Sequence, residues 1–306
     1  MLSMSQPHPH QFELDIKGPF DFQRAFKDVT RAPFQLTERV NVNRMTGVFP
    51  IQGGIVGASI SAFGTIAKPH VSVQWELLEN ESDPASVQSY FHDLFQTRVD
   101  LRDFYAHVAD EPVFQKLIHQ FHGFTFLRKH SFFEAMTTAI IDQQLNVAFA
   151  TTLRERFIRS FGRIITWQGE EHWLFPQPED LIDLTPADLR PLQFSQRKAE
   201  YILDFARGLR EGTIQPSKLS QLDDDSLLDA LTKIRGVGRW TAEYVGMMAF
   251  GRLDYLPAAD IGLQRAIQQL FQLSERPTEA QVRARGEAWK PYRGLATFYL
   301  WHASES

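Results

Sequence analysis

The chain has 306 residues, which suggests about two domains, and its shares of hydrophobic and charged residues are those of an ordinary globular protein. Cysteine is absent, which excludes disulfides, thiol catalysis and cysteine-ligated zinc or iron–sulfur clusters. The net charge of −5 argues against a strongly basic nucleic-acid surface. The sequence has neither a membrane-spanning apolar run nor a secretory signal, so we expect a cytoplasmic protein without membrane contact.

The first 85 residues predict a lead followed by a small α+β domain. Residues 1–11 are expected to be disordered, and residues 12–85 to form an antiparallel sheet with one short helix. Gly53 and Gly54 separate two strand candidates and predict a hairpin turn. The strand candidates are residues 12–16, 44–51, 55–62 and 71–77, and the helix candidate is residues 20–27.

From residue 86 onward, apolar residues recur at helical spacing, which predicts a mainly α domain over residues 86–306. Ser131 and Glu134 have the spacing of a capping box at a helix N-terminus. Residues 142–146 interrupt the helical pattern. The helix candidates are residues 86–97, 112–121, 133–141, 146–162, 196–209, 225–233, 240–250, 261–271, 278–290 and 294–302, with a further start at 185.

Residues 231–242 combine a helix end, the sequence Gly-Val-Gly and a helix start. Gly236 and Gly238 permit a tight turn with positive φ. Backbone N–H groups at the N-terminus of the second helix, together with the helix dipole, suit a phosphate oxygen without needing lysine or arginine. Such a contact would reconcile a nucleic-acid partner with an acidic chain. By itself, however, the motif favours an ordinary glycine-lined turn between packed helices.

Asp260 ends the segment Leu-Pro-Ala-Ala-Asp and precedes a predicted helix. Taken alone, it is expected to be an N-cap, because this is a common role for aspartate. The alternative is a carboxylate that faces a cleft, where the helix dipole keeps it ionised.

Taken together, these segments resemble the helix-hairpin-helix DNA glycosylases, and among them bacterial 3-methyladenine DNA glycosylase II, the AlkA type. The resemblance rests on Ile-Arg-Gly-Val-Gly-Arg-Trp-Thr-Ala-Glu-Tyr at 234–244 and on Leu-Pro-Ala-Ala-Asp at 256–260. Residues 12–85 resemble the family's additional domain only weakly. Further matching segments are residues 139–144, 174–178, 196–199 and 289–293, with Trp301, so that the match runs in order over residues 130–302.

The resemblance implies a mainly α fold, a helix-hairpin-helix glycosylase domain preceded by the small α+β domain. It divides the glycosylase domain into two helical subdomains with the active-site cleft between them. One comprises residues 133–252, and the other comprises residues 86–132 together with residues 253–306.

The resemblance further implies a DNA repair enzyme that flips alkylated purines, of the 3-methyladenine and 7-methylguanine type, out of duplex DNA and hydrolyses the N-glycosidic bond. Asp260 falls on the family's catalytic aspartate. A fixed carboxylate there stabilises an oxocarbenium-like transition state and orients water. Trp240 stands where relatives with lyase activity have a lysine, so no Schiff base forms. We therefore expect a monofunctional enzyme that leaves an abasic site.

Other groups of residues acquire expected roles from the same resemblance. The base pocket is expected to contain the aromatic side chains of Trp240, Tyr244 and Trp301, which attract a cationic base. The DNA-binding hairpin comprises Gly236, Val237, Gly238, Arg239 and Thr241. The residues expected to fill the gap left by the flipped nucleotide are Gln143, Gln144 and Leu145. The backbone carbonyls expected to hold a monovalent cation are those of Thr232, Ile234 and Val237.

Two positions depart from the family pattern. Gln144 stands where the best-known member has an apolar wedge, with Leu145 one residue later, so which side chain enters the duplex stays open. Asp28 lies near a position where the family offers an aromatic side chain to the base pocket. The shape of the pocket and the range of lesions therefore stay open as well.

The expected partner is double-stranded DNA with alkylated bases, bound by a monomer without any cofactor apart from the structural cation. Three alternatives stay open: a glycosylase for another class of lesion, a non-catalytic helix-hairpin-helix DNA-binding protein, and a helical protein unrelated to DNA. The intact Asp260 argues against the second. The missing cysteines exclude an iron–sulfur relative.

Overall fold

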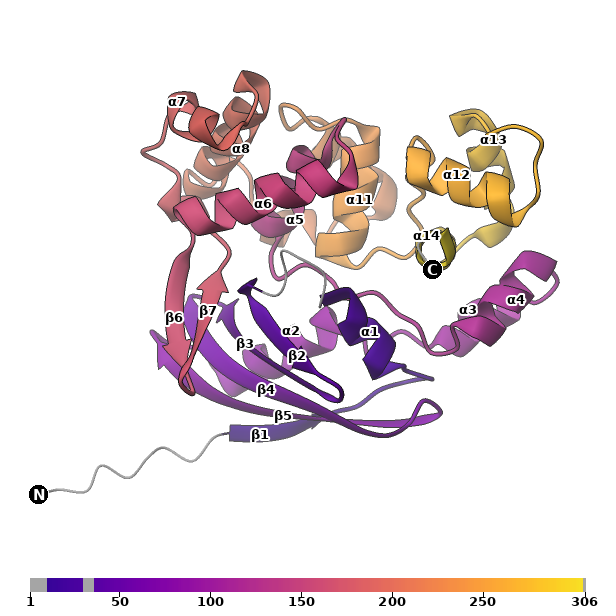
Figure 1. Cartoon of the computed structure of the whole chain (residues 1–306), viewed down its shortest axis with the longest axis horizontal. Coiled ribbons are helices and arrows are strands. Elements are labelled where there is room, and N and C mark those ends of the chain that lie inside the picture. The colour runs from indigo at the N-terminus through magenta and orange to yellow at the C-terminus, as the bar shows by residue number, and fades with distance from the viewer. Residues whose placement is uncertain (1–9, 30–35, 305–306) are drawn as a thin grey trace, which may run out of the picture.

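The computed structural model describes residues 10–29 and 36–304, without the side chains of residues 27–29. The N-terminal part is a five-stranded antiparallel sheet with the strand order β1-β5-β4-β3-β2 (Figure 1). This confirms the predicted α+β region with an antiparallel sheet. Its strands are β1 (His10–Leu14), β2 (Glu38–Asn41), β3 (Arg44–Ile51), β4 (Gly54–Thr65) and β5 (Lys68–Glu79).

Three details of the sheet differ from the sequence prediction. β2, which pairs with β3, was not among the predicted strands. β1 begins at His10, inside the segment expected to be disordered, because His10 pairs with Trp75 of β5 and stacks its ring on the indole. Residues 1–9 lie outside the described residues. The turn between β3 and β4 is made by Gln52 and Gly53, which both have positive φ, so Gly54 is already the first residue of β4.

Different elements cover the two faces of the sheet. Helices α1 (Phe22–Val29) and α2 (Pro84–Leu94) pack on one face, where alternate residues of β4 such as Val56 are buried. The other face carries the hairpin of β6 (Arg163–Trp167) and β7 (Glu170–Leu174), which the sequence prediction missed (Figure 1).

The β6–β7 hairpin ties the helical part of the chain to the sheet. Its Trp167 packs on Gly57 of β4, where a Cβ would lie 2.6 Å from the indole. The indole N–H donates to Glu76, and Arg163 pairs with Glu79 through two hydrogen bonds of 2.8 and 2.7 Å. The β6–β7 hairpin of the helical part therefore shares a small hydrophobic core with the N-terminal sheet.

Replacing Trp167 with alanine should lower the free energy of unfolding by about 3 kcal/mol, because its neighbours would fill the resulting cavity only partly. Trp167 is 5% exposed, whereas Leu77 of the five-stranded sheet is 43% exposed. Leu77→Ala is the control and should cost about 0.5 kcal/mol or less. Denaturant unfolding of the three proteins measures both effects. A loss in Trp167→Ala of only about 0.5 kcal/mol, as small as that expected for the control, would show that the Trp167 contact does not stabilise the fold.

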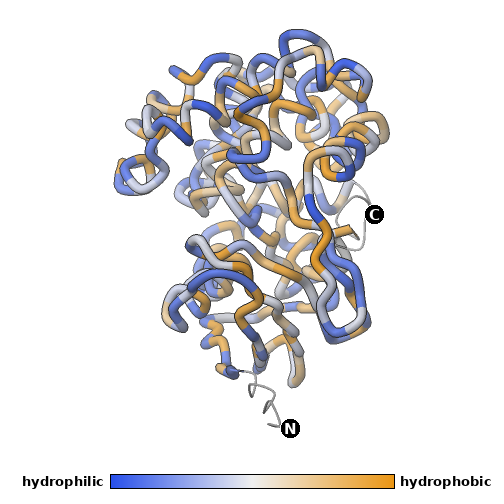
Figure 2. The backbone as a smooth tube through the Cα atoms, turned by 90° about the vertical axis from the view of Figure 1, so that its left-hand side faces the viewer, coloured by the Kyte–Doolittle hydropathy of each residue, from blue (hydrophilic) through white to orange (hydrophobic). Residues whose placement is uncertain are grey.

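The rest of the described chain is mainly helical and encloses two hydrophobic cores. No helix in the described ranges is long and apolar enough to cross a membrane. In Figure 2 the helical part lies above the sheet, and hydrophobic and hydrophilic residues alternate along its helices. The helices are α3 (Leu101–His107), α4 (Pro112–Gln120), α5 (Phe132–Asp142), α6 (Val147–Phe161), α7 (Pro186–Leu189), α8 (Gln196–Arg210), α9 (Pro216–Leu219), α10 (Asp224–Thr232), α11 (Arg239–Phe250), α12 (Ile261–Leu270), α13 (Glu279–Gly286) and α14 (Arg293–Ser304).

The two cores are built from different helices. The first core takes most of its residues from α5, α6, α8, α10 and α11, and the second from α3, α4, α12, α13 and α14. At the start of α5, Ser131 Oγ accepts from the Glu134 N–H at 3.0 Å, as predicted. The capping box is only half formed, because the Glu134 carboxylate accepts from the His130 N–H and lies 3.5 Å from Lys129 Nζ.

Candidate active site

Asp260 is the N-cap of α12. Its Oδ1 accepts hydrogen bonds from the backbone N–H of Leu263 at 2.6 Å and from the indole N–H of Trp301 at 3.0 Å. The side chain is half-buried, and its Oδ2 accepts no hydrogen bond from the residues that the structure describes. The N-cap interpretation is therefore confirmed, and it leaves one carboxylate oxygen available for chemistry.

The loop that carries Asp260 is held from two sides. Gln264 is buried, and its side-chain amide donates to the loop backbone at 2.9 Å. Arg283 of α13 donates to the carbonyl of Leu256 at 3.2 Å and pairs with Glu243 of α11 at 2.8 Å. Glu243 is only 2% exposed, whereas the Arg283 side chain is 25% exposed, so the carboxylate end of this ion pair is buried. Sequence reasoning missed these supporting residues; the partners of Arg283 lie 27 and 40 residues away in the chain.

Aromatic side chains gather beside Asp260, where the two cores meet. We refer to Trp240, Tyr244, Phe298 and Trp301 as the aromatic cluster. Trp240 stacks on Tyr244 with ring centroids 5.8 Å apart, and Phe298 meets Trp301 edge-on at 5.2 Å. Tyr244, Phe298 and Trp301 contact both cores. Phe298 was not predicted, although its spacing of three residues from Trp301 on one helix could have indicated it.

The aromatic cluster presents neutral rings next to a carboxylate. Burial raises the pKa of the Tyr244 phenol, and the charges of Asp142 and Asp260 raise it further. Tyr244 therefore stays protonated at physiological pH. The Nε1 atom of Trp240 is buried and has no hydrogen-bond partner among the described residues. Electron-rich aromatic faces beside a negative charge suit a cationic ligand.

The hairpin between α10 and α11 contains two glycines, and the structure explains the need for glycine at only one of the two positions. Gly236 has a φ of 84°, and a side chain there would collide with the ring of Tyr201. The Val237 N–H donates to the Ile234 carbonyl at 3.0 Å and closes the turn. At Gly238, in contrast, φ is −87° and a Cβ would meet nothing within 4 Å. Packing within the chain therefore explains Gly236 but not Gly238.

Helix α11 begins without a side-chain cap. Its N-cap is the exposed Gly238, whereas the helices before and after it are capped by Asp223 and Asp260. The backbone N–H groups of residues 239–241 find no acceptor within the described ranges. Unpaired amides and the helix dipole give this end a positive potential. Of the predicted hairpin residues, Gly238 and Arg239 are exposed, while the side chains of Val237 and Thr241 are buried; these two offer only their backbone.

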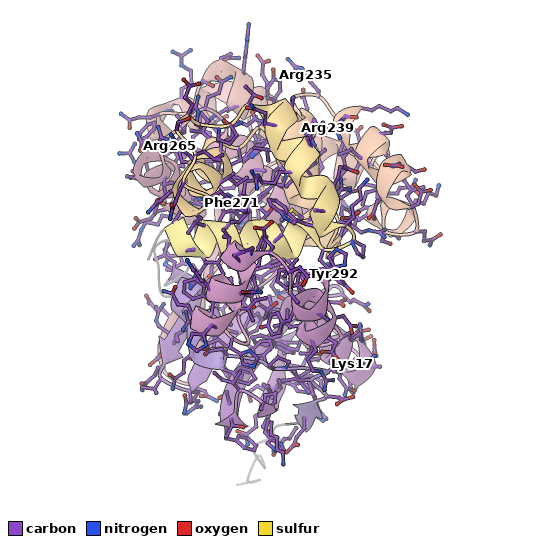
Figure 3. All side chains as sticks on the ribbon, turned by 90° about the vertical axis from the view of Figure 1, so that its right-hand side faces the viewer. Lys17, Arg235, Arg239, Arg265, Phe271 and Tyr292 are labelled. Carbon is purple, nitrogen blue, oxygen red and sulfur yellow. The ribbon has the colours of Figure 1, made fainter. Side chains whose placement is uncertain are left out.

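Arginine side chains near the hairpin are mostly paired with carboxylates. Arg235 contacts two acidic side chains of α8 at 2.6 and 2.5 Å, and Arg239 contacts the buried glutamate of its own helix at 2.9 Å. Arg265 of α12 is exposed and forms no ion pair with the described residues. Figure 3 shows Arg235, Arg239 and Arg265 at the helical end of the molecule, far from Lys17 at the sheet end. The uncapped amides of α11 therefore add a positive potential to the hairpin that its paired arginines do not supply.

The structure separates the three residues predicted to fill a gap in DNA. Gln143 turns toward the hairpin, where its amide donates to the Gly236 carbonyl at 3.0 Å and to Thr241 Oγ1 at 2.9 Å. Leu145 is half-buried against the first core. Gln144 is exposed and has a φ of 57°. Only Gln144 of the three has an uncommitted side chain.

Two further sequence predictions remain predictions. The first is the monovalent cation on the carbonyls of Thr232, Ile234 and Val237. These carbonyls lie in one tight turn after α10, in which the Ile234 carbonyl accepts the Val237 N–H and Thr232 is exposed. Asp28 lies in α1, but its side chain is outside the described residues.

Comparison with known proteins gives one family. The family model described as HhH-GPD superfamily base excision DNA repair protein matches residues 137–291. YfjP of Bacillus subtilis (strain 168) is 32% identical over 96% of this chain and 99% of its own length. A second protein of that organism, named DNA-3-methyladenine glycosylase, is 34% identical over 70% of this chain and 71% of its own length.

The similarity of fold extends beyond the matched family segment. The solved structure of a 3-methyladenine DNA glycosylase from Archaeoglobus fulgidus superposes with a TM-score of 0.82 and covers 96% of this chain and 98% of its own. Its sequence identity is 22%, so this likeness concerns the fold. It includes the N-terminal sheet, which lies outside residues 137–291.

Proposed function

The chain belongs to the HhH-GPD superfamily of base excision DNA repair proteins, and from this premise we propose that it is a DNA glycosylase for alkylated purines of the 3-methyladenine and 7-methylguanine type. The observation that carries the proposal is the carboxylate of Asp260. One of its oxygens is held by two hydrogen bonds and the other is free, beside an aromatic cluster. The name of the Bacillus subtilis relative supports the same class of lesion.

The chemistry follows from the charge of the lesion. Alkylation at N3 or N7 makes a purine cationic, so it leaves the sugar with its bonding electron pair and without prior protonation. The C1′–N bond breaks through an oxocarbenium-like transition state, which the free oxygen of Asp260 stabilises. Water then bonds to C1′ and loses its proton, and the products are the free base and an abasic site.

Recognition of the base is assigned to the aromatic cluster. A cationic purine gains cation–π attraction from Tyr244 and Trp301, while a normal neutral purine gains much less. Tyr244 remains a neutral ring because burial raises its pKa. The lesion reaches this site only when it leaves the base stack, so the proposal includes base flipping.

DNA backbone binding is assigned to the uncapped end of α11. A phosphate oxygen would accept from the N–H groups of residues 239–241, next to the open face of Gly238. A monovalent cation on the carbonyls of Thr232, Ile234 and Val237 would add a positive charge at this turn. We propose that a monomer binds double-stranded DNA in this way in the cytoplasm.

A lyase step is not part of the proposal. Trp240 occupies the position where lyase-competent relatives carry a lysine. The nearby Lys198 is not a free amine, because its Nζ donates to the carbonyls of Ile141 and Gln143 at 2.6 and 2.7 Å. No Schiff base with the sugar is therefore expected.

The test is base release from duplexes that carry single lesions. We expect release of 3-methyladenine and 7-methylguanine, strand scission only after alkaline cleavage of the abasic site, and no protein–DNA product with borohydride. Duplexes with 8-oxoguanine or uracil should stay intact. If only 8-oxoguanine or uracil were released, the protein would be a glycosylase for another class of lesion. DNA binding without release of any base would indicate a binding protein.

Trp301→Phe should lower kcat about 10- to 100-fold with little change in KM. Phenylalanine keeps an aromatic face but removes the N–H that orients Asp260, and a hydrogen bond to a charged group contributes about 1.5–3 kcal/mol. Trp173→Phe, the same exchange at a half-buried tryptophan of β7 that makes no contact with Asp260, is the control. Steady-state kinetics on a 7-methylguanine duplex measure both variants. A change in KM alone would mean that Trp301 contacts the base without orienting the carboxylate.

A further inference from the structure

Residues 143–146, between α5 and α6, contact the hairpin through one side chain. The amide of Gln143 uses both of its N–H groups, one on the Gly236 carbonyl and one on Thr241 Oγ1. These acceptors lie on either side of Gly238, the first in the turn and the second in the first turn of α11. Thr241 is 2% exposed and Gln143 is half-buried, so the link is largely shielded from solvent.

The backbone of Gln143 is held by Lys198 of α8. The Lys198 ammonium donates to the carbonyls of Ile141 and Gln143, at the end of α5, where helix carbonyls lack partners within the helix. Burial lowers the pKa of Lys198, and the charge of Asp142 acts in the opposite direction. The same residue, Gln143, is thus fixed by its side chain to one element and by its backbone to another.

The rest of this loop is also fixed, with one exception. Leu145 packs against the first core, and Asn146 caps α6 by accepting from the Phe149 N–H at 2.9 Å. Gln144 lies between them, exposed, and makes no hydrogen bond with the described residues. The loop is therefore ordered before any DNA binds, and it presents a single free glutamine.

We propose that Gln143 is a positioning residue that makes the loop and the hairpin one rigid unit. When the hairpin holds the DNA backbone, the loop then presents Gln144 to the duplex without further ordering. This inference rests on the base flipping of the proposed function. An ordered loop loses little conformational entropy on binding, so more of the binding free energy offsets the unpairing of the lesion. Without Gln143, ordering and flipping have to occur in the same step.

The test compares one lesion in two contexts. A 7-methylguanine opposite cytosine has to be unpaired, whereas the same lesion opposite an abasic-site analogue does not. We expect Gln143→Ala to release the paired lesion about 30-fold more slowly and the unpaired one within about threefold of wild type. Lys198→Met should show the same pattern. Gln168→Ala, an exposed glutamine of positive φ in the β6–β7 turn, is the matched control and should equal wild type.

Equal slowing on both substrates would overturn the inference, because it would indicate general damage to the site. Unchanged release of the paired lesion would overturn it too. A second measurement does not depend on catalysis: 2-aminopurine beside the lesion brightens when the stack opens, and this signal should fall in Gln143→Ala. If the wild-type protein opens the stack but releases no base, the proposed reaction fails while the fluorescence of the variants still decides the role of Gln143.

Discussion

Asp260→Asn should remove most of the base release while leaving the protein folded and bound to DNA. We expect kcat to fall about 100- to 10,000-fold, because a neutral amide neither stabilises a cationic sugar nor assists water. Asparagine caps a helix as well as aspartate does. Its Oδ1 can still accept from Leu263 and Trp301, which preserves the local geometry. Single-turnover release of 7-methylguanine measures the rate, and thermal unfolding measures the stability.

The chain provides a matched control for this variant. Asp223 caps α10 as Asp260 caps α12, accepting from the Ser226 N–H at 2.8 Å, but it lies away from the aromatic cluster. Asp223→Asn should therefore leave both activity and stability within experimental error of wild type. An Asp260→Asn protein that keeps a tenth or more of the activity would exclude a direct role for the carboxylate, as would a loss that follows unfolding.

The two interpretations of Asp260 from sequence turn out not to exclude one another. The residue caps a helix through Oδ1, and that bond fixes the position of Oδ2. Local pattern predicts the cap because its partner is three residues away. The indole of Trp301, 41 residues distant, could be linked to Asp260 only through family resemblance. Neither local pattern nor family resemblance indicated the ion pair of Arg283 and Glu243 that supports the loop.

The β6–β7 hairpin was missed in the sequence for a physical reason. β6 and β7 are short, and their apolar residues have no partner nearby in the chain. Ile165, Trp167 and Leu174 instead bury against Val48 and Ile55 of the N-terminal sheet, more than a hundred residues earlier in the chain. Helices with N-cap residues and amphipathic spacing carry their signal within one or two turns, so α8 and α12 were predicted to within one residue. Strands of this kind depend on tertiary contacts that a sequence pattern does not contain.

Long-range contacts also decide which loop residue does what. Gln143 and Gln144 are adjacent and identical in chemistry, so neither composition nor spacing separates them. The separation comes from acceptors some 90 residues away, at Gly236 and Thr241, which engage the first glutamine and leave the second free. The proposed anion site is compatible with the acidic net charge, since a site made of backbone amides would add no basic residues to the composition.

Gly238→Asp should stabilise the fold and at the same time weaken DNA binding. A Cβ at this position meets nothing within 4 Å, and φ is −87°, so the side chain fits. Aspartate would cap α11 and raise the free energy of unfolding by about 0.3 kcal/mol. The same carboxylate would take the amides from the phosphate and repel it. Because hydrogen bonds to a charged group contribute about 1.5–3 kcal/mol, affinity for an abasic-analogue duplex should fall at least about 30-fold.

Gly238→Asn distinguishes charge from steric effects in this position. Asparagine has nearly the same size and the same capping ability but no charge, so it should bind DNA more tightly than the aspartate variant and more weakly than wild type. Fluorescence anisotropy at several salt concentrations measures the three affinities. A stabilised Gly238→Asp protein that keeps full affinity would show that phosphate binds elsewhere. The glycine at position 238 would then have no explanation, because no contact among the described residues excludes a side chain there.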